Sequence, residues 1–303
     1  MMGKIQAVEV RDVEAIEQSI GRGGTIVAKT FPLDTGVANV RMEFTWIWTS
    51  AGYCTPRHMH AFDQIRYVLG GEFTSEVGTI KEGEIGYFPE GVSYGPQDFK
   101  TDNTGLILQF PGPSGIEYFT HFELDAARRK LIEEGGTFDK GVYTKHLSDG
   151  RKINADSHKA CWEAVSGRKL VFPKGRFAEP VVMSPDVCRW IPDPKLKGVE
   201  RKHLGTFAEM KTGVEFIKLA PGARLLAQHN IHAEIRYLVD GSVSYGGKVW
   251  TGGTTRDRGA YFYIPHDTDV DEFSTDGGAV FLSISLPMVG ILAAEATEAI
   301  KAA

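Results

Sequence analysis

The sequence has few cysteines and no long apolar run, and both shortages narrow what the protein can be. Its three cysteines, Cys54, Cys161 and Cys188, stand far apart and form no CxxC motif. We therefore expect reduced thiols in a cytoplasmic protein. No run approaches the roughly 20 apolar residues of a membrane-spanning helix, so no membrane partner is expected. Charges interrupt the N-terminal stretch MMGKIQAVEVRDVEAIEQ, so we expect no signal peptide there.

The sequence also has no excess of basic residues. Its 34 Lys and Arg are outnumbered by 39 Asp and Glu, which gives a formal net charge of −5, and the basic residues are scattered along the chain. A nucleic-acid-binding protein needs a basic surface to neutralise phosphates, so this class of partner is not expected. The chain is rich in glycine instead, with 35 Gly beside 14 Pro, as is common in folds built from short strands and turns.

One sequence unit occurs twice in the chain. The stretch QIRYVLGGEFT begins at Gln64 and returns as EIRYLVDGSVS from Glu234, an offset of 170 residues. Further along, GEIGYFPEG from Gly83 returns as GAYFYIPHD from Gly259, an offset of 176 residues. An insertion of six residues around 246–257 explains the change of offset. Such internal similarity indicates a duplicated structural unit.

Each copy consists of short runs that are typical of β-strands. Apolar or alternating runs such as RMEFTWIW and LILQF are separated by Gly, Pro and Asp at intervals of roughly ten residues, the pattern of an all-β sandwich or barrel. We expect two domains, residues 1–150 and 151–303. Residues 115–136 predict an amphipathic helix that ends at a Gly-Gly pair, and EATEAIKAA predicts a short C-terminal helix. His121, on the first of these helices, is expected at the surface or in packing.

The first copy carries two histidines at a spacing suited to metal binding. In GYCTPRHMHAFDQIRYVLG, His58 and His60 follow a glycine after five residues, and Gln64 comes four residues after His60. The stretch GEIGYFPEGVSY follows and ends at Tyr94. Side chains on a strand alternate between its two faces, so both histidines share one face with Gln64 and Arg66. We expect these side chains to point into one barrel.

These two stretches resemble the two sequence motifs of the cupin superfamily. The family patterns are G-x5-H-x-H-x3,4-E-x6-G and G-x5-P-x-G-x2-H-x3-N, and the resemblance covers residues 40–110 and 210–285. The resemblance implies two tandem jelly-roll barrels with a few peripheral helices, so the chain is similar to a bicupin. In cupins the motif residues hold one divalent metal ion inside the barrel. The resemblance therefore implies a metal site at His58 and His60.

The chain departs from the family pattern at two of the four ligand positions. Gln64 stands where the family has Glu, and Tyr94 stands where it has His. Gln binds cations through its carbonyl oxygen, although as a neutral ligand it leaves the site more positive. Tyr94 is a candidate ligand as a phenolate and a candidate catalytic acid as a neutral phenol. Arg66 is a candidate for binding an anionic substrate group, or else part of an internal salt bridge, which the repeated Arg236 favours.

The second copy has lost most of the ligand positions. The residues at the positions of the four candidate ligands are Gln228, Asn230, Glu234 and Val270. Three nearby histidines could form a different site after a local shift of the strand: His229, His232 and His266. The simpler expectation is a structural barrel that supports the first one.

The resemblance leaves the activity open, because cupin barrels host many reactions. Bicupins of about this length with one metal-competent barrel resemble aromatic or diketone-type dioxygenases. We therefore expect a non-haem Fe(II) dioxygenase acting on a small aromatic or oxo-acid substrate. One alternative is a redox-neutral lyase or isomerase that uses Mn, Ni or Zn. Another is a non-catalytic protein that binds a small molecule, which the two lost ligands favour. A homodimer is expected because jelly-roll edges commonly pair between subunits.

Overall fold

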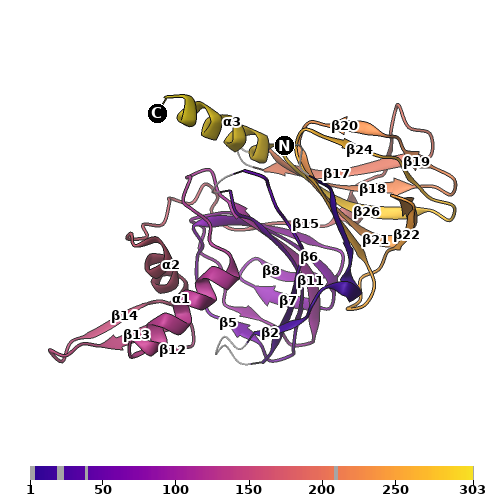
Figure 1. Cartoon of the computed structure of the whole chain (residues 1–303). Coiled ribbons are helices and arrows are strands. Elements are labelled where there is room, and N and C mark those ends of the chain that lie inside the picture. Colours follow the sequence, from indigo (N-terminus) through magenta and orange to yellow (C-terminus); the bar gives the residue numbers. More distant parts are fainter. Residues whose placement is uncertain (1–3, 19–23, 38–39, 208–210, 303) are drawn as a thin grey trace.

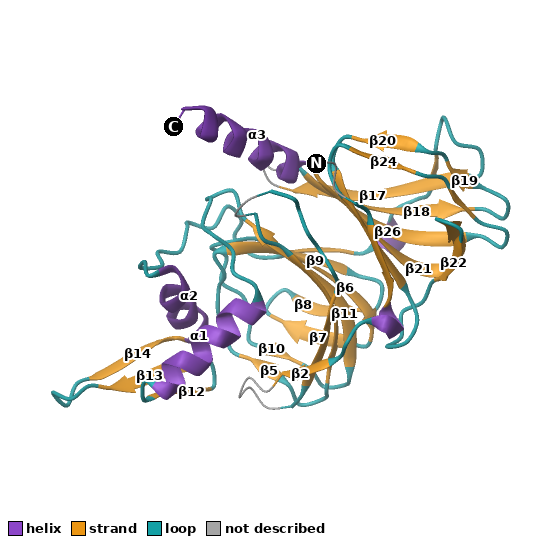
Figure 2. Cartoon of the chain, viewed as in Figure 1, coloured by secondary structure: helices purple, strands orange, loops and turns teal. Residues whose placement is uncertain are grey.

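The first of two β-barrels comprises most strands of the N-terminal half (Figures 1 and 2). The computed structural model describes residues 4–18, 24–37, 40–207 and 211–302. The strands of this barrel are β2 (Ile16–Gln18), β3 (Ile26–Thr30), β4 (Glu43–Thr49), β5 (Cys54–Thr55), β6 (Phe62–Gly70), β7 (Glu72–Ser75), β8 (Gly78–Lys81), β9 (Ile85–Phe88), β10 (Gln97–Asp98) and β11 (Asn103–Pro111). One sheet has the order β9-β6-β11-β4-β3-β2, and the other has the order β5-β10-β7-β8.

The second barrel follows in the C-terminal half. Its strands are β16 (Ile191–Pro192), β17 (Val199–Phe207), β18 (Thr212–Leu219), β19 (Arg224–Leu225), β20 (Gln228–Asn230), β21 (Ala233–Tyr245), β22 (Lys248–Thr251), β23 (Ala260–Ile264), β24 (Thr268–Val270), β25 (Phe273–Ser274) and β26 (Ala279–Leu286). The main sheet has the order β23-β21-β26-β18-β17-β16, and β20 pairs with β24. The strand pairs in both barrels are antiparallel. The predicted all-β class with two jelly-roll barrels is confirmed.

The two barrels repeat one strand register, as the internal similarity predicted. Three residue pairs of the first barrel recur in the second at the offsets of 170 and 176 residues: Gln64 with Phe88 as Glu234 with Ile264, Gln64 with Gln109 as Glu234 with Ser285, and His58 with Tyr94 as Gln228 with Val270. Each position of one barrel can therefore be compared directly with its counterpart in the other.

The barrels exchange edge strands. Strand β1 (Gln6–Glu9), at the start of the chain, pairs with β23 of the second barrel. In the opposite direction β15 (Val181–Met183) pairs with β9 of the first barrel. The boundary expected near residue 150 falls in the turn between β13 (Val142–His146) and β14 (Lys152–Asp156), which pair as a hairpin. A cut there does not separate the two sheets, because each barrel contains a strand from the other half of the chain.

Aromatic residues join the two barrels in one apolar core. Phe31, directly after β3, stacks on Tyr261 of β23 with ring centroids 4.6 Å apart. Tyr87 of β9 stacks on Phe207 of β17 at 4.4 Å. All four rings are buried. A large apolar interface of this kind holds two domains in a fixed relation, unlike the more polar contacts that permit domain motion.

The helices lie at the margins of the barrels (Figure 2). Helix α1 (His121–Glu133) confirms the helix predicted within 115–136. It begins with a capping box between Thr120 and Glu123, and Gly135 follows its end with a positive φ of 87°. It packs beside α2 (Ser157–Ser166).

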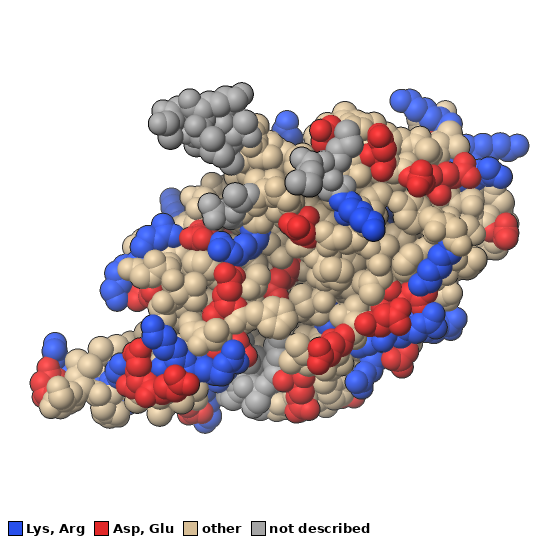
Figure 3. All heavy atoms as spheres, in the orientation of Figure 1, with Lys and Arg blue, Asp and Glu red and all other residues tan. Residues whose placement is uncertain are grey.

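A small sheet extends from the same end of the first barrel. Strand β12 (Gly136–Asp139) pairs with β13, which pairs with β14, and Figure 1 shows this sheet projecting from the body of the molecule. At the C-terminal end the expected helix is present as α3 (Pro287–Ala302). None of the helices in the described ranges has the length and apolar character needed to cross a bilayer. Basic and acidic side chains are interspersed on the face drawn in Figure 3.

Candidate functional site

The fold brings His58, His60 and Tyr94 together in the first barrel. The ring centroids of the two histidines lie 4.8 Å apart, and the ring of Tyr94 lies 4.5 Å from that of His58. An isolated β-bridge fixes the backbone here. The amide nitrogen of His58 donates to the carbonyl oxygen of Tyr94 at 3.0 Å, and the reverse hydrogen bond measures 2.9 Å. The two cupin-like motifs therefore meet at this point.

A backbone contact orients the His58 imidazole. Its Nδ1 lies 2.7 Å from the carbonyl oxygen of Pro56. A carbonyl oxygen can only accept, so this contact assigns the proton to Nδ1 and the lone pair to Nε2. Hydrogen bonds of this kind are typical of metal-binding histidines, because they fix the tautomer and the ring orientation. The side chain is half-buried, so it is held in place and still partly accessible.

Gln64 and Tyr94 form hydrogen bonds with Arg66. The guanidinium of Arg66 donates to Gln64 Oε1 from Nε at 3.1 Å and from Nη2 at 2.8 Å, and Nη2 also lies 3.1 Å from the Tyr94 hydroxyl. That hydroxyl donates to the same oxygen of Gln64 at 3.3 Å. The oxygen through which Gln64 is expected to bind a metal therefore accepts hydrogen bonds from Arg66 and Tyr94 instead. Gln64 and Tyr94 are almost fully buried, so water hardly competes for these contacts.

The charge of Arg66 is not balanced by a carboxylate among the described residues. Its guanidinium lies over the ring of Phe88, 4.4 Å from the centroid, and Nη1 donates to Gln97 Oε1 at 3.0 Å. These partners, like Gln64 and Tyr94, are neutral. The counterpart Arg236 differs, because it donates to both carboxylate oxygens of Glu234 at 2.7 and 2.8 Å. The internal salt bridge weighed for Arg66 is thus found in the second barrel and not in the first.

A third imidazole lies near the histidine pair. His158 of α2, outside both motifs, has its ring centroid 5.4 Å from that of His60. Across the described ranges, no group of three or more His, Cys, Asp and Glu side chains is arranged to hold a metal ion. The imidazoles that lie together here are those of His58, His60 and His158.

Sequence reasoning missed a second polar group in the first barrel. Glu43 of β4 is buried, and its carboxylate contacts Nδ1 of His121. The same carboxylate accepts from the Tyr118 hydroxyl at 2.6 Å and from the His121 amide at 2.7 Å. Burial, followed by the charge of Glu43, raises the pKa of Tyr118 well above its ordinary value. His121 was expected at the surface or in packing. The available signal was a single carboxylate in a strand whose other residues are all uncharged.

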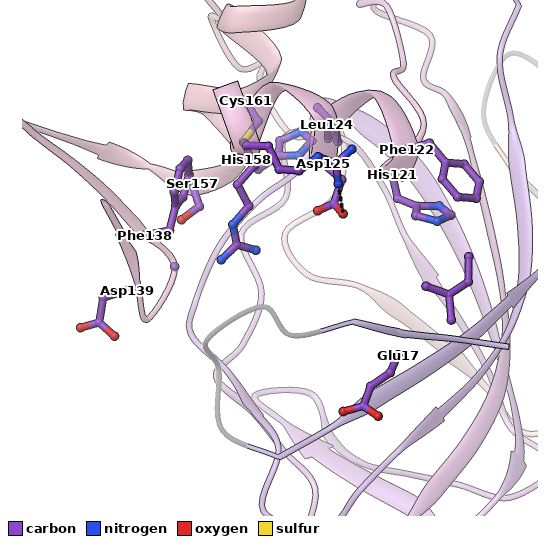
Figure 4. A pocket seen from close by; sticks show the side chains of 14 residues that line it. Glu17, His121, Phe122, Leu124, Asp125, Phe138, Asp139, Ser157, His158 and Cys161 are labelled. Carbon is purple, nitrogen blue, oxygen red and sulfur yellow. Dashed lines mark hydrogen bonds and ion pairs between the residues drawn. The ribbon is translucent and has the colours of Figure 1, made fainter. Parts of the chain in front are cut away.

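A pocket of about 440 Å³ lies beside these histidines, between β2, α1, β12 and α2 (Figure 4). His121 and His158 line it, and each also contacts a group of the first barrel: His121 contacts Glu43, and His158 lies against His60. Arg128 of α1 is also part of the wall. The pocket and the interior of the first barrel therefore share two histidines.

At the rim of the second barrel, His229 bridges two carboxylates. Its Nδ1 lies 2.9 Å from Asp269 and its Nε2 lies 2.9 Å from Asp267. Hydrogen bonds with Asp269 and then Asp267 raise its pKa above the ordinary 6.5. The imidazolium form is thus favoured in the folded state. Its stabilising effect is fully present below the unfolded pKa and is lost as the pH rises through the folded pKa.

We expect an NMR pH titration to place the pKa of His229 above 6.5. Asp269→Asn should lower that pKa, because it removes one of the two charged partners. Asp271→Asn, a change at a nearby carboxylate that does not contact the ring, is the control. A pKa that does not move in the Asp269→Asn protein would contradict the bridging geometry.

No protein-family model matches the sequence, and no curated protein matches it significantly. Solved structures do share its fold. A candidate dioxygenase of Nostoc punctiforme PCC 73102 superposes with a TM-score of 0.61 at 12% identity, over 94% of this chain and 84% of that one. A deletion mutant of Bacillus subtilis oxalate decarboxylase superposes with a TM-score of 0.53 at 16% identity, over 93% of this chain and 76% of that one. A structure of the same enzyme from work on its Mn(II) centres superposes with a TM-score of 0.52 at 15% identity, over 93% of this chain and 77% of that one. The fold expected from the resemblance, two tandem β-barrels, is thus the fold that these structures share with the chain.

Proposed function

We propose that the chain is a metal-dependent cupin enzyme that holds one divalent ion through His58 and His60. The observation that carries the proposal is the pair of half-buried imidazoles 4.8 Å apart, one of them oriented by a backbone carbonyl. Imidazole is a suitable ligand for Fe, Ni and Zn. Two protein ligands are fewer than the usual three of a catalytic site, so the remaining positions would belong to water and substrate. The two imidazoles therefore fit a weakly bound metal ion that has several coordination positions open.

The neighbouring side chains support catalysis on an anionic substrate. A bound ion would polarise a substrate oxygen or, as Fe(II), hold dioxygen beside the substrate. Arg66 binds a carboxylate or enolate, because within the described part of the chain its guanidinium has only neutral partners. The Tyr94 hydroxyl, 3.1 Å from Arg66, holds or moves a proton at its oxygen. Substrate approaches through the pocket whose wall includes His158.

Within this class we propose a non-haem Fe(II) dioxygenase acting on a small aromatic or oxo-acid substrate. The likeness to a candidate dioxygenase and the cation at Arg66 support it. The second candidate is a redox-neutral lyase that uses Mn, Ni or Zn. The Tyr94 hydroxyl beside Arg66 favours it as a proton donor, and so does the likeness to oxalate decarboxylase.

Metal analysis and oxygen consumption test the proposal together. The protein is purified without chelator or metal-affinity tag, its transition metals are quantified, and it is then screened with catechols, hydroxybenzoates, diketones and oxo-acids in an oxygen electrode. Iron bound at the site with substrate-dependent oxygen uptake supports the dioxygenase. Turnover without oxygen, with Mn, Ni or Zn, supports the lyase. Failure to bind any of these ions after reconstitution would overturn the metal-dependent function.

The second barrel predicts how a glutamate behaves at position 64. Glu234, at the equivalent position, pairs with Arg236. We therefore expect Gln64→Glu to pair with Arg66 and to change the affinity for Co(II), measured by calorimetry, by less than about tenfold, or 1.4 kcal/mol. Gln64→Met, similar in length and uncharged, is the control and should also keep the metal. Stronger tightening in the Gln64→Glu protein would place residue 64 among the metal ligands.

A further inference from the structure

A cavity of about 330 Å³ opens into the second barrel at the place that the histidine pair occupies in the first. Its wall includes Gln228 and Asn230, which stand at the positions of His58 and His60. The volume lies at the lower end of the roughly 300–1,000 Å³ typical of small-molecule sites. The second barrel thus has a cavity for a small molecule at the equivalent place, but amide side chains stand there in place of imidazoles.

The inner wall of this cavity is a fixed set of buried polar groups. Arg236 and Glu234 form a two-pronged ion pair, and Ser283 of β26 donates to Glu234 Oε1 at 2.7 Å. The exposed fractions of Arg236, Glu234 and Ser283 are 5%, 9% and 2%. Because each of these groups is held by the others, their remaining donors and acceptors are presented to the cavity in a defined geometry.

A second ion pair lies on the same sheet and in the wall of the same cavity. Arg201 Nη1 donates to Glu215 Oε1 at 2.5 Å, and its Nε donates to Asp193 at 2.8 Å. The two arginines of the wall are thus paired with carboxylates, and His229, which also lines the cavity, is held between Asp267 and Asp269. An anionic ligand would find both guanidinium groups already paired, and a cation would find both carboxylates paired, so neither sign of charge is favoured.

We infer that this cavity binds a neutral, hydroxyl-rich molecule of monosaccharide size, without a metal. The inner ion pair and the half-buried Ser285 offer both donors and acceptors, which is what adjacent hydroxyl groups require. Gln228 and Asn230 add amides at the mouth. A small neighbouring cavity shares Arg201, Gln228 and Arg236 and adds leucine side chains, which suit the C–H face of a sugar ring.

The test is a ligand-observed NMR titration of the whole protein with a defined panel. The neutral members are xylose, arabinose, glucose, myo-inositol and glycerol, and the charged members are glucuronate and glucosamine. We expect saturation transfer to at least one neutral member and weaker binding of its charged analogue. Ser285→Gln, which places in the cavity the side chain of the equivalent Gln109, should weaken binding by about tenfold or more.

A matched change in the first barrel distinguishes the two sites. Thermal unfolding first establishes that the variants are folded. His60→Ala should leave sugar binding unchanged, because His60 lies in the other barrel. Three outcomes overturn the inference: no neutral member binds at millimolar concentration, the charged analogues bind as well as the neutral ones, or binding survives Ser285→Gln and is lost in His60→Ala. Failure here leaves the metal site of the first barrel untouched, since metal analysis tests that site.

Discussion

The double variant His58→Ala/His60→Ala is expected to lose its divalent metal completely and to keep its fold. Removing a residue that hydrogen-bonds a metal ligand commonly lowers metal affinity 10–100-fold. Removing both ligands themselves should therefore lower it by more than about 100-fold. The fold should survive because both imidazoles are half-buried and lie outside the main apolar core. Elemental analysis after dialysis measures the metal, and the spectrum of the Co(II)-loaded protein shows whether imidazole ligands are present.

The second barrel supplies the control for this experiment. Asn230 stands at the position of His60, so Asn230→Ala should leave the metal content unchanged. Thermal unfolding of both proteins should resemble that of the unchanged chain. Full metal content in the double histidine variant would place the ion elsewhere, and loss of metal in Asn230→Ala would mean that the second barrel takes part in holding it.

The second large effect is expected for the buried ion pair of the second barrel. Glu234→Ala should lower the free energy of unfolding by about 3–5 kcal/mol, because it leaves the Arg236 guanidinium buried without its carboxylate. Burial alone would raise the pKa of Glu234, but the charge of Arg236 holds that pKa below its ordinary value. The stabilisation is therefore present above the unfolded pKa and is lost as the pH falls through the folded pKa. Urea titrations at two pH values measure both effects.

Two further variants separate the charge from the packing. Glu234→Leu combined with Arg236→Met removes both charges and should recover most of the lost stability, since apolar replacements of buried ion pairs are often neutral. Gln64→Ala in the first barrel should cost less, about 1–3 kcal/mol, because Arg66 keeps Tyr94 and Gln97 as partners. If Glu234→Ala proved as mild as Gln64→Ala, the charge of Arg236 would have to be satisfied in another way.

The sequence predicted the barrels well and their edges poorly. The repeated QIRY and EIRY stretches fix the offset between the barrels, and the strand pairs of Gln64 and Glu234 follow that offset. The exchanged strands β1 and β15 could not be predicted. They span four and three residues, too few to show a periodicity, and their partners are determined by tertiary packing far along the chain.

In the candidate site, too, the sequence predicted which residues come together but not which hydrogen bonds they form. Strand alternation and motif spacing predicted that both histidines, Gln64, Arg66 and Tyr94 would meet, and they do. Spacing could not show that Gln64 turns its oxygen toward Arg66, since residues that share a face have several possible hydrogen-bond partners. Glu43 and His121 were missed because 78 residues separate them in the chain.

The exchanged edge strand has a consequence for how the protein is made. Strand β1 leaves the ribosome well before its partner β23, which begins about 250 residues later. At about 5–20 residues per second, β1 waits roughly 13–50 seconds before its partner exists. During that time its unpaired edge is open to other chains. Expression yield should therefore depend on chaperones and on translation rate, and two fragments separated near residue 150 should need co-expression, because each would carry a strand that the other lacks.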